Sequence, residues 1–280
     1  MKKFKFDFLY TISVFLFLVF TLVPILWCFI ISISPESTLF SDEVTYLPSV
    51  ISLENYKKLL NPNLREGASF FNAITNSIKT ASITIFLGIP ISIFSGYAFS
   101  RLKFRGKEIF EKLVLVTIIV PLFTTIIPLY TIFSDYEILD NTFWLSLIYV
   151  SSFLPVITWI TSNYFNTFPE EIEEMAMIEG CGNIQVFFYI ILPNTYPIIL
   201  TSILMIFLMS WNQYQIPLIL ASSRETKPLS ILIAEFSSKD MIQYGQMAAA
   251  GILALLPPSI LAIVFRKYLV GGLTKGATKG

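Results

Sequence analysis

Residues 174–193, EMAMIEGCGNIQVFFYIILP, form a charged and glycine-broken segment between two long apolar runs. Glu174 opens the segment, Gly180 lies six residues further on, and three spaced positions close it, Ile190, Leu192 and Pro193. Glycine readily adopts the left-handed conformation that ends a helix. The pattern therefore predicts a short helix, a turn and a second helical piece. Because its start is too polar to enter lipid, we expect this segment to lie along a membrane surface.

The rest of the chain is apolar enough to fill a bilayer. It is 55% hydrophobic and only 14% charged, whereas soluble domains are about a quarter charged. A helix needs roughly 20 apolar residues to cross the hydrocarbon core, and long runs free of Asp, Glu, Lys and Arg supply such lengths. We therefore expect an all-α polytopic membrane protein with about six transmembrane helices, over residues 8–34, 74–100, 110–133, 141–163, 196–221 and 247–265.

This order of helices predicts three parts. Residues 1–73 hold the first transmembrane helix and an external segment. Residues 74–267 form the core, which includes a loop at 164–195 that contains the glycine-broken segment. Residues 268–280 form a tail.

The distribution of charge predicts the orientation. With six spans, both termini and two internal loops fall on one side, which carries Lys2, Lys3, Lys5, Arg101, Lys103, Arg105, Lys107, Arg266, Lys267, Lys275 and Lys279. Basic loops stay in the cytoplasm, so we expect both termini there, in a plasma or inner membrane. The loop at 164–195 is an exception, because it holds five glutamates and no Lys or Arg. Connectivity still places it in the cytoplasm, and its acidity needs a separate reason.

The acidic part of that loop has the features of a helix start. Pro169 suits the first position of a helix, and the macrodipole favours the negative charges that follow it, Glu170, Glu171 and Glu173. Ile172, Met175 and Ala176 recur at helical spacing and predict a narrow apolar stripe. A simpler interpretation is an interfacial helix whose glutamates only face water.

The spacing from Glu174 to Pro193 resembles the EAA motif, E-A-A-x-x-x-G-x(9)-I-x-L-P, of the membrane subunits of ATP-binding-cassette importers. Met175 stands where that family usually has alanine. Three further stretches resemble the carbohydrate-importer permeases, and most of all the second permease of maltose-type pairs: PEEIEEMAMIEG (169–180), WNQYQIPL (211–218) and GGLTKGATKG (271–280).

The resemblance implies a fold, partners and site residues. It implies a subunit that pairs with a different permease, binds a dimer of ATPases below the membrane and receives sugar from an extracellular or periplasmic binding protein. The residues that would couple to the ATPase are Glu173, Glu174, Met175, Ala176, Gly180, Ile190, Leu192 and Pro193. The tail residues that would reach the ATPases are Gly271, Gly272, Lys275, Gly276, Lys279 and Gly280.

A polar run in the fifth predicted span is a candidate for the substrate pathway. Aromatic faces pack on sugar rings and amides bond hydroxyl groups, and the run contains Trp211, Asn212, Gln213 and Tyr214. Alternatively, these residues form an aromatic belt and hydrogen bonds between helices. In maltose-type pairs the sugar contacts lie largely in the other permease subunit.

Several classes of function are disfavoured. The sequence has no histidine and no metal-ligand spacing, so we expect no metal, no cofactor and no enzymatic activity. It has no G-x-x-x-x-G-K-[ST] loop, so ATP must be handled by another polypeptide. A proton-coupled transporter would bury charged residues within its spans, a channel would need a selectivity element, and nothing points to nucleic acid. An importer for phosphate, amino acids or peptides stays open, because such importers share the EAA motif.

Overall fold

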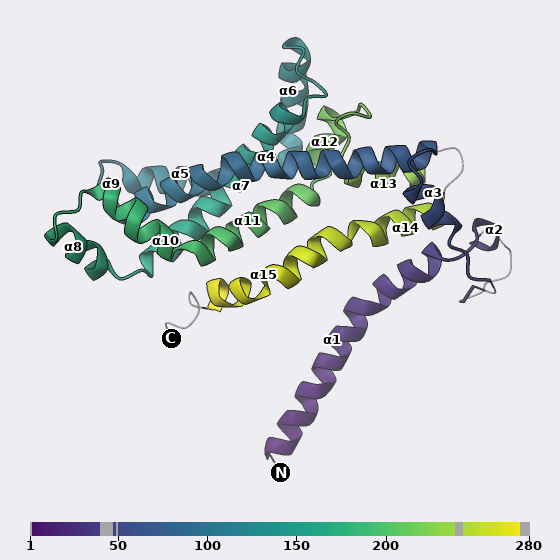
Figure 1. Cartoon of the computed structure of the whole chain (residues 1–280), viewed down its shortest axis with the longest axis horizontal. Helices are drawn as coiled ribbons and strands as arrows, with labels where there is room; N and C mark the ends of the chain where they lie inside the picture. The colour runs from purple at the N-terminus through teal and green to yellow at the C-terminus, as the bar shows by residue number, and fades with distance from the viewer. Residues whose placement is uncertain (1, 40–46, 49, 239–242, 275–280) are drawn as a thin grey trace. The chain divides into compact units, whose positions relative to one another are not determined.

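The computed structural model describes residues 2–39, 47–48, 50–238 and 243–274, and these contain helices and no strand (Figure 1). The chain divides into two compact units. One comprises Met1–Asn72 and Ile231–Pro257, and the other Ala73–Ser230 and Pro258–Gly280. We describe each unit by itself.

The first unit is built around two helices, α1 (Lys2–Ser32) and α14 (Tyr244–Ala254), which pack together. Its other members are α2 (Glu36–Leu39), α3 (Glu54–Leu60), the first turns of α4 (Arg65–Arg101) and most of α13 (Leu229–Ser238). The buried Asn55 side chain of α3 donates to the carbonyl oxygens of Ser32 (3.0 Å) and Ser34 (3.3 Å). These bonds satisfy carbonyl groups that the end of α1 leaves free.

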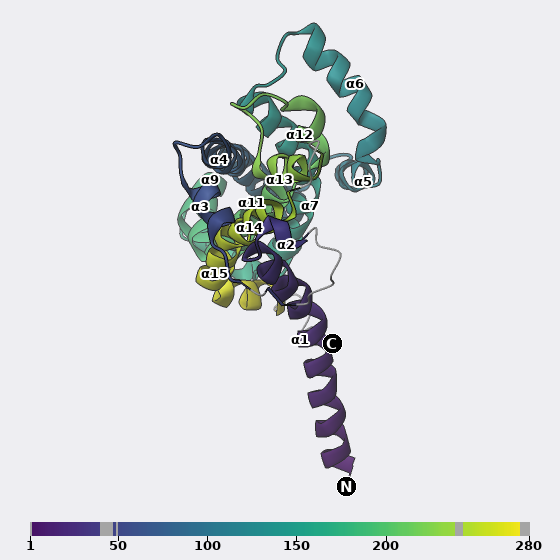
Figure 2. The same cartoon turned by 90° about the vertical axis from the view of Figure 1, so that its right-hand side faces the viewer.

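The second unit holds the remainder of α4 and the helices that follow it. They are α5 (Lys107–Thr117), α6 (Leu122–Asp135), α7 (Thr142–Asn166), α8 (Glu170–Ile178), α9 (Asn183–Gln185), the π-helix η1 (Val186–Ile191), α10 (Leu192–Asn194), α11 (Tyr196–Trp211), α12 (Gln215–Leu220) and α15 (Leu256–Thr274). α5 and α6 meet at an angle and stand apart from α4, which is seen end-on in Figure 2.

Two apolar clusters hold this unit together. One lies between α6, α7, α11 and α12 and contains Tyr149 and Ile157, each at most 1% exposed. The other lies beneath α8 and contains Phe165, Ala176 and Ile191. The second cluster fixes the acidic loop to the membrane helices.

Within the described residues, four helices are long and apolar enough to cross a membrane: Leu9–Ser32, Arg65–Arg101, Thr142–Asn166 and Tyr244–Arg266. A fifth is present if the bent pair Asn183–Asn194 and Tyr196–Trp211 counts as one span. The prediction of an all-α polytopic membrane protein is thereby confirmed, although the number of long spans is four or five rather than six.

The third predicted span, 110–133, is wrong as a single helix. It is divided into α5 and α6, and residues 118–121 separate them. Pro121 has no N–H to donate and disfavours helical backbone in the residue before it. Its own backbone is extended, with φ −66° and ψ 129°. Pro128, by contrast, lies inside α6.

The fifth and sixth predicted spans also differ in their bounds. The predicted helix at 196–221 ends at Trp211, and α12 follows after a three-residue break. The last span begins at Tyr244 and continues as α15 to Thr274, past the predicted end at residue 265. The second span begins at Arg65 rather than 74, which shortens the external segment. The division into parts 1–73, 74–267 and 268–280 concerns roles and stays a prediction.

Candidate coupling site

The acidic loop contains α8, which starts one residue later than the sequence predicts. Pro169 is the N-cap residue, with extended backbone, and Glu170, Glu171 and Glu173 fill the first turn. Negative charge there interacts favourably with the positive end of the helix dipole. The prediction of a short helix at this position is confirmed, with Pro169 one residue before its first turn.

Gly180 ends α8 through its backbone conformation. Its φ is +96°, in the left-handed region that favours glycine. The Gly180 N–H donates to the Met177 carbonyl (3.0 Å), and the Cys181 N–H donates to the Ala176 carbonyl (3.0 Å). This pair of bonds is the Schellman arrangement, which satisfies the last carbonyls of a helix. The glycine at this position is therefore required by the turn.

The second helical piece runs from Asn183 to Asn194 and includes a π-helical turn. The Gln185 side chain accepts a hydrogen bond from the Gly182 N–H (2.9 Å) and so caps its start. Of the predicted closing residues, Ile190 and Leu192 are half-buried and Pro193 is exposed. The helix axis turns by 71° before α11 begins at Tyr196. This second piece thus lies at a steep angle to α11.

The two faces of α8 differ in character. Glu173 and Ala176 are both 6% exposed and face the unit, where Ala176 packs in the cluster with Phe165 and Ile191. Met175 is 58% exposed and Ile178 is 85% exposed. The predicted stripe of Ile172, Met175 and Ala176 is therefore wrong in part, because the buried face is centred on Glu173 and Ala176.

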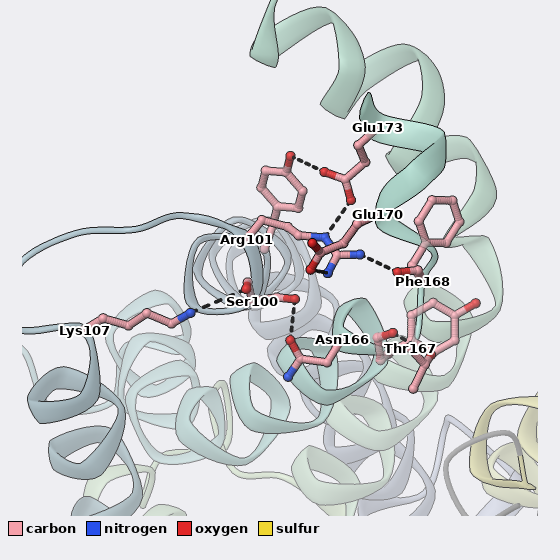
Figure 3. A network of polar contacts seen from close by, with 10 residues as sticks. Ser100, Arg101, Lys107, Asn166, Thr167, Phe168, Glu170 and Glu173 are labelled. Carbon is pink, nitrogen blue, oxygen red and sulfur yellow. Dashed lines mark hydrogen bonds and ion pairs between the residues drawn. The ribbon is translucent and has the colours of Figure 1, made fainter. Parts of the chain in front are cut away.

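Arg101 at the end of α4 explains why a glutamate faces inward (Figure 3). Its Nε donates to Glu173 Oε1 (2.6 Å), its Nη1 to Glu170 Oε1 (3.2 Å), and its Nη2 to the Phe168 carbonyl. Tyr97 donates from its hydroxyl to Glu173 Oε2 (3.2 Å). The Arg101 and Glu173 side chains are 9% and 8% exposed. Breaking such a buried pair by removing one partner costs about 3–5 kcal/mol.

The ends of α4 and α7 are also joined. The Ser100 hydroxyl donates to Asn166 Oδ1 (2.7 Å), and Lys107 Nζ donates to the Ser100 carbonyl (3.4 Å) (Figure 3). The basic turn that starts at Arg101 therefore lies at the same end of the unit as the acidic loop. This proximity gives a physical reason for two of the five glutamates in that loop, since Glu170 and Glu173 are paired with Arg101.

The helix α8 is buried on one face, through Glu173 and Ala176. On its other side it exposes the apolar side chains of Met175 and Ile178. Residues 88–275 match the family described as binding-protein-dependent transport system inner membrane component. The match covers most of the second unit and includes α8, Gly180 and Arg101. The chain belongs to this family.

Relatives of this permease cover nearly its whole length. The trehalose transport system permease protein of Mycobacterium tuberculosis is 28% identical over 263 residues, 93% of each chain. The trehalose/maltose transport system permease protein of Thermococcus litoralis is 29% identical over 271 residues, 96% of this chain and 95% of the relative. The crystal structure of a bacterial ABC transporter involved in alginate import contains a chain of the same fold, with a TM-score of 0.77 at 20% identity over 96% of this chain and 98% of that one.

The predicted tail lies at the edge of what the structure describes. Gly271 and Gly272 belong to the last turns of α15, which ends at Thr274. Four predicted ATPase contacts lie outside the described residues: Lys275, Gly276, Lys279 and Gly280. The role of the tail in the permease stays a prediction.

The candidate pathway residues of the permease are largely occupied by local contacts. Trp211 is 6% exposed and stacks on Phe207, with ring centroids 5.3 Å apart. Asn212 donates from Nδ2 to the Leu208 carbonyl of its own helix (2.9 Å). Gln213 Oε1 accepts from the Tyr214 N–H (3.0 Å) and from the N–H of Gln215, the first residue of α12 (3.3 Å), and so caps the start of this helix. Tyr214 is 40% exposed, which makes it the more accessible of the two aromatic residues in the run.

The described part of the permease contains no group of three or more His, Cys, Asp or Glu side chains that could hold a metal ion. Its two cysteines are free: Cys28 is exposed and Cys181 partly exposed. Arg101 is the residue at this site that the sequence pattern does not indicate. It was counted only as a basic residue, and no local pattern pairs it with Glu173.

Proposed function

We propose that this permease is the membrane subunit of an ATP-driven importer for carbohydrates. It forms half of the translocation pathway together with a second, different permease. It is coupled to a separate ATPase dimer by its acidic loop, and it receives the sugar from an extracellular or periplasmic binding protein. Both termini lie in the cytoplasm.

The single observation that carries the coupling role is the exposed apolar tip of the loop. Met175, Met177 and Ile178 on α8 are 58%, 43% and 85% exposed, and Tyr189 on the next piece is 79% exposed. Met175 and Ile178 lie one turn apart on α8, and exposed apolar side chains that gather at one place on a protein mark interaction sites. The tip sits on a helix whose opposite face is buried, so a partner that grips it can move the helix as a rigid body.

The relatives support carbohydrate as the transported solute. Two permeases that match along nearly the whole chain are named for trehalose and for trehalose/maltose. The sequence of the polar run at 211–218 supports the same class.

The proposal is tested by purifying the full-length permease through a tag on its N-terminus from the membranes of its source cell. We expect an ATP-binding-cassette ATPase and a second permease to co-purify in mass spectrometry. In intact cells, deletion of the permease should abolish uptake of radiolabelled trehalose or maltose. If a labelled amino acid, phosphate or peptide is lost instead, the carbohydrate part of the proposal is wrong.

A variant separates coupling from folding. Ile178→Glu places a charge on the tip and should lower the recovered ATPase about tenfold, because an apolar contact centre tolerates little charge. Leu53→Glu is the matched control, since Leu53 is also exposed (55%) but lies in the other unit. Equal recovery of ATPase with Ile178→Glu and with the unmodified chain would contradict the coupling role of the tip.

A further inference from the structure

Arg101 joins the acidic loop to a helix that is distant from it in sequence. The loop is covalently connected to α7 and α11, whereas Arg101 ends α4, and the contact with Glu173 spans 72 positions. We propose that Arg101 is a positioning residue: by holding Glu173 it makes α8 move with α4, so that force on the loop also enters α4. This rests on the proposed function, because it concerns how the same loop transmits force.

The hydrogen bonds of Arg101 fix both the place and the rotation of α8. Its three nitrogen atoms donate to three different acceptors, on Phe168, Glu170 and Glu173. These acceptors lie just before α8 and in its first turn. A planar guanidinium holds such acceptors in a fixed geometry, and the single ammonium of a lysine does not. The three bonds therefore act as a clamp on the start of the helix.

Both carboxylate oxygens of Glu173 are held by hydrogen bonds. One carboxylate oxygen accepts from Arg101 and the other from the Tyr97 hydroxyl, also on α4. Both charged side chains are at least nine-tenths buried. Leaving one of them buried without its partner is strongly unfavourable. Glu170 differs, because it is 72% exposed and an exposed ion pair contributes little.

An apolar contact supports the same connection. The Phe187 ring of the π-helix lies 4.8 Å from the Tyr97 ring and 5.3 Å from the Phe94 ring, measured between centroids. Ile93 of α4 belongs to the cluster that buries Ala176. The end of α4 thus contacts both helical pieces of the loop. The ionic clamp and the aromatic contact lie on adjacent turns of α4, as expected for one rigid block.

The first test needs no ATPase. Hydrogen exchange of the amides in 170–178 is measured on the purified full-length permease in detergent. Arg101→Lys and Glu173→Gln should each speed exchange about tenfold, because α8 opens more often when the clamp is weakened. Glu170→Gln is the matched control and should change exchange less than about twofold. Unchanged exchange with both clamp variants would overturn the inference.

The second test uses the importer purified with its ATPase and reconstituted in vesicles. We expect Arg101→Lys and Glu173→Gln each to reduce the trehalose transported per ATP hydrolysed about fivefold, with recovered ATPase within about twofold of normal. The double variant should lose no more than the worse single variant, since both changes act on one contact. Additive losses, or a fall in ATPase recovery in parallel with transport, would overturn the positioning role.

The two proposals fail in different ways. If no ATPase co-purifies with the unmodified permease, the proposed function is wrong, whatever the hydrogen-exchange rates of the variants are. If ATPase is recovered and transport is normal in both clamp variants, only the inference about Arg101 is wrong.

Discussion

Gly96 of α4 lies against Thr161 of α7 with no room for a side chain between them. A Cβ at Gly96 would lie 2.3 Å from Thr161 Oγ1 and 3.0 Å from the Ser162 backbone nitrogen. Thr161 also donates from its hydroxyl to the Ser92 carbonyl of α4 (3.0 Å). Small residues allow membrane helices to approach closely in this way, and the contact lies one to two turns from Arg101.

Gly96→Ala should therefore destabilise the permease. The added methyl group meets backbone as well as side chain, so α4 and α7 must separate, at a cost of about 1–3 kcal/mol. The melting temperature in detergent measures the loss. Gly251→Ala is the control, because a Cβ there has nothing within 4 Å. A Gly96→Ala protein as stable as the control would show that the two helices can shift without cost.

At Gly180 the energetic cost of a left-handed backbone can be measured without a steric clash. Its φ is +96°, and a Cβ at this position meets nothing within 4 Å. Gly180→Ala should cost about 1–2 kcal/mol from the left-handed backbone alone, and Gly180→Asn less. Gly182→Ala is the matched control, since Gly182 has φ −75°. We expect faster hydrogen exchange at the end of α8 for Gly180→Ala only; equal exchange in both variants would exclude a role for the conformation.

The hydrogen bonds of the Asp140 carboxylate lead us to expect that the stability of the permease depends on pH. It precedes α7 in the left-handed conformation, with φ 54°. Its carboxylate accepts hydrogen bonds from the Ser223 N–H (2.7 Å), the Thr226 hydroxyl (2.9 Å) and the Ser222 hydroxyl (3.2 Å). Burial opposes ionisation, but these hydrogen bonds outweigh it and hold the pKa of Asp140 below the ordinary value. The carboxylate thus fastens the α6–α7 turn to the segment after α12.

Because the folded pKa of Asp140 is lowered, its contribution to stability is present above the unfolded pKa, about 3.9. It is lost as the pH falls through the folded pKa. Asp140→Asn keeps the left-handed conformation accessible and should cost about 1–2 kcal/mol at pH 7. The difference in melting temperature between the two proteins should stay constant from pH 6 down to about pH 4 and shrink at lower pH. A difference that stays constant below about pH 4 as well would contradict the assignment.

The sequence predicted the parts of this fold that depend on local pattern. The left-handed turn at Gly180 and the acidic first turn of α8 follow from residue types at short spacing, and both are confirmed. Pro121 and Pro128 both mark possible interruptions of the third predicted span, but local pattern does not tell that only Pro121 separates two helices. What local pattern could not reveal is which helices lie side by side.

The contact between Arg101 and Glu173 shows that limit clearly. A buried glutamate in a loop of five glutamates looks like its neighbours in sequence. Only the packing of α4 against the loop distinguishes it. In the same way, Trp211 and Asn212 were predicted as candidates for sugar contact from residue type, whereas stacking on Phe207 and a bond to the Leu208 carbonyl engage them locally.

Tyr214 is the residue of the polar run on which a role in the substrate pathway can be tested. Tyr214 is 40% exposed. Gln213 Oε1, by contrast, accepts from the backbone N–H groups of Tyr214 and Gln215 at the start of α12, and neither bond depends on the tyrosine side chain. An aromatic contact contributes about 0.5–1.5 kcal/mol beyond its buried area. Tyr214→Ala should therefore raise the KM of trehalose uptake about fivefold, and Tyr214→Phe, which keeps the ring, should raise it less.

Gln213→Ala should lower stability, through loss of the cap, with little change in KM. An unchanged KM in Tyr214→Ala would mean that this ring does not meet the sugar, and the contacts would then be sought in the second permease.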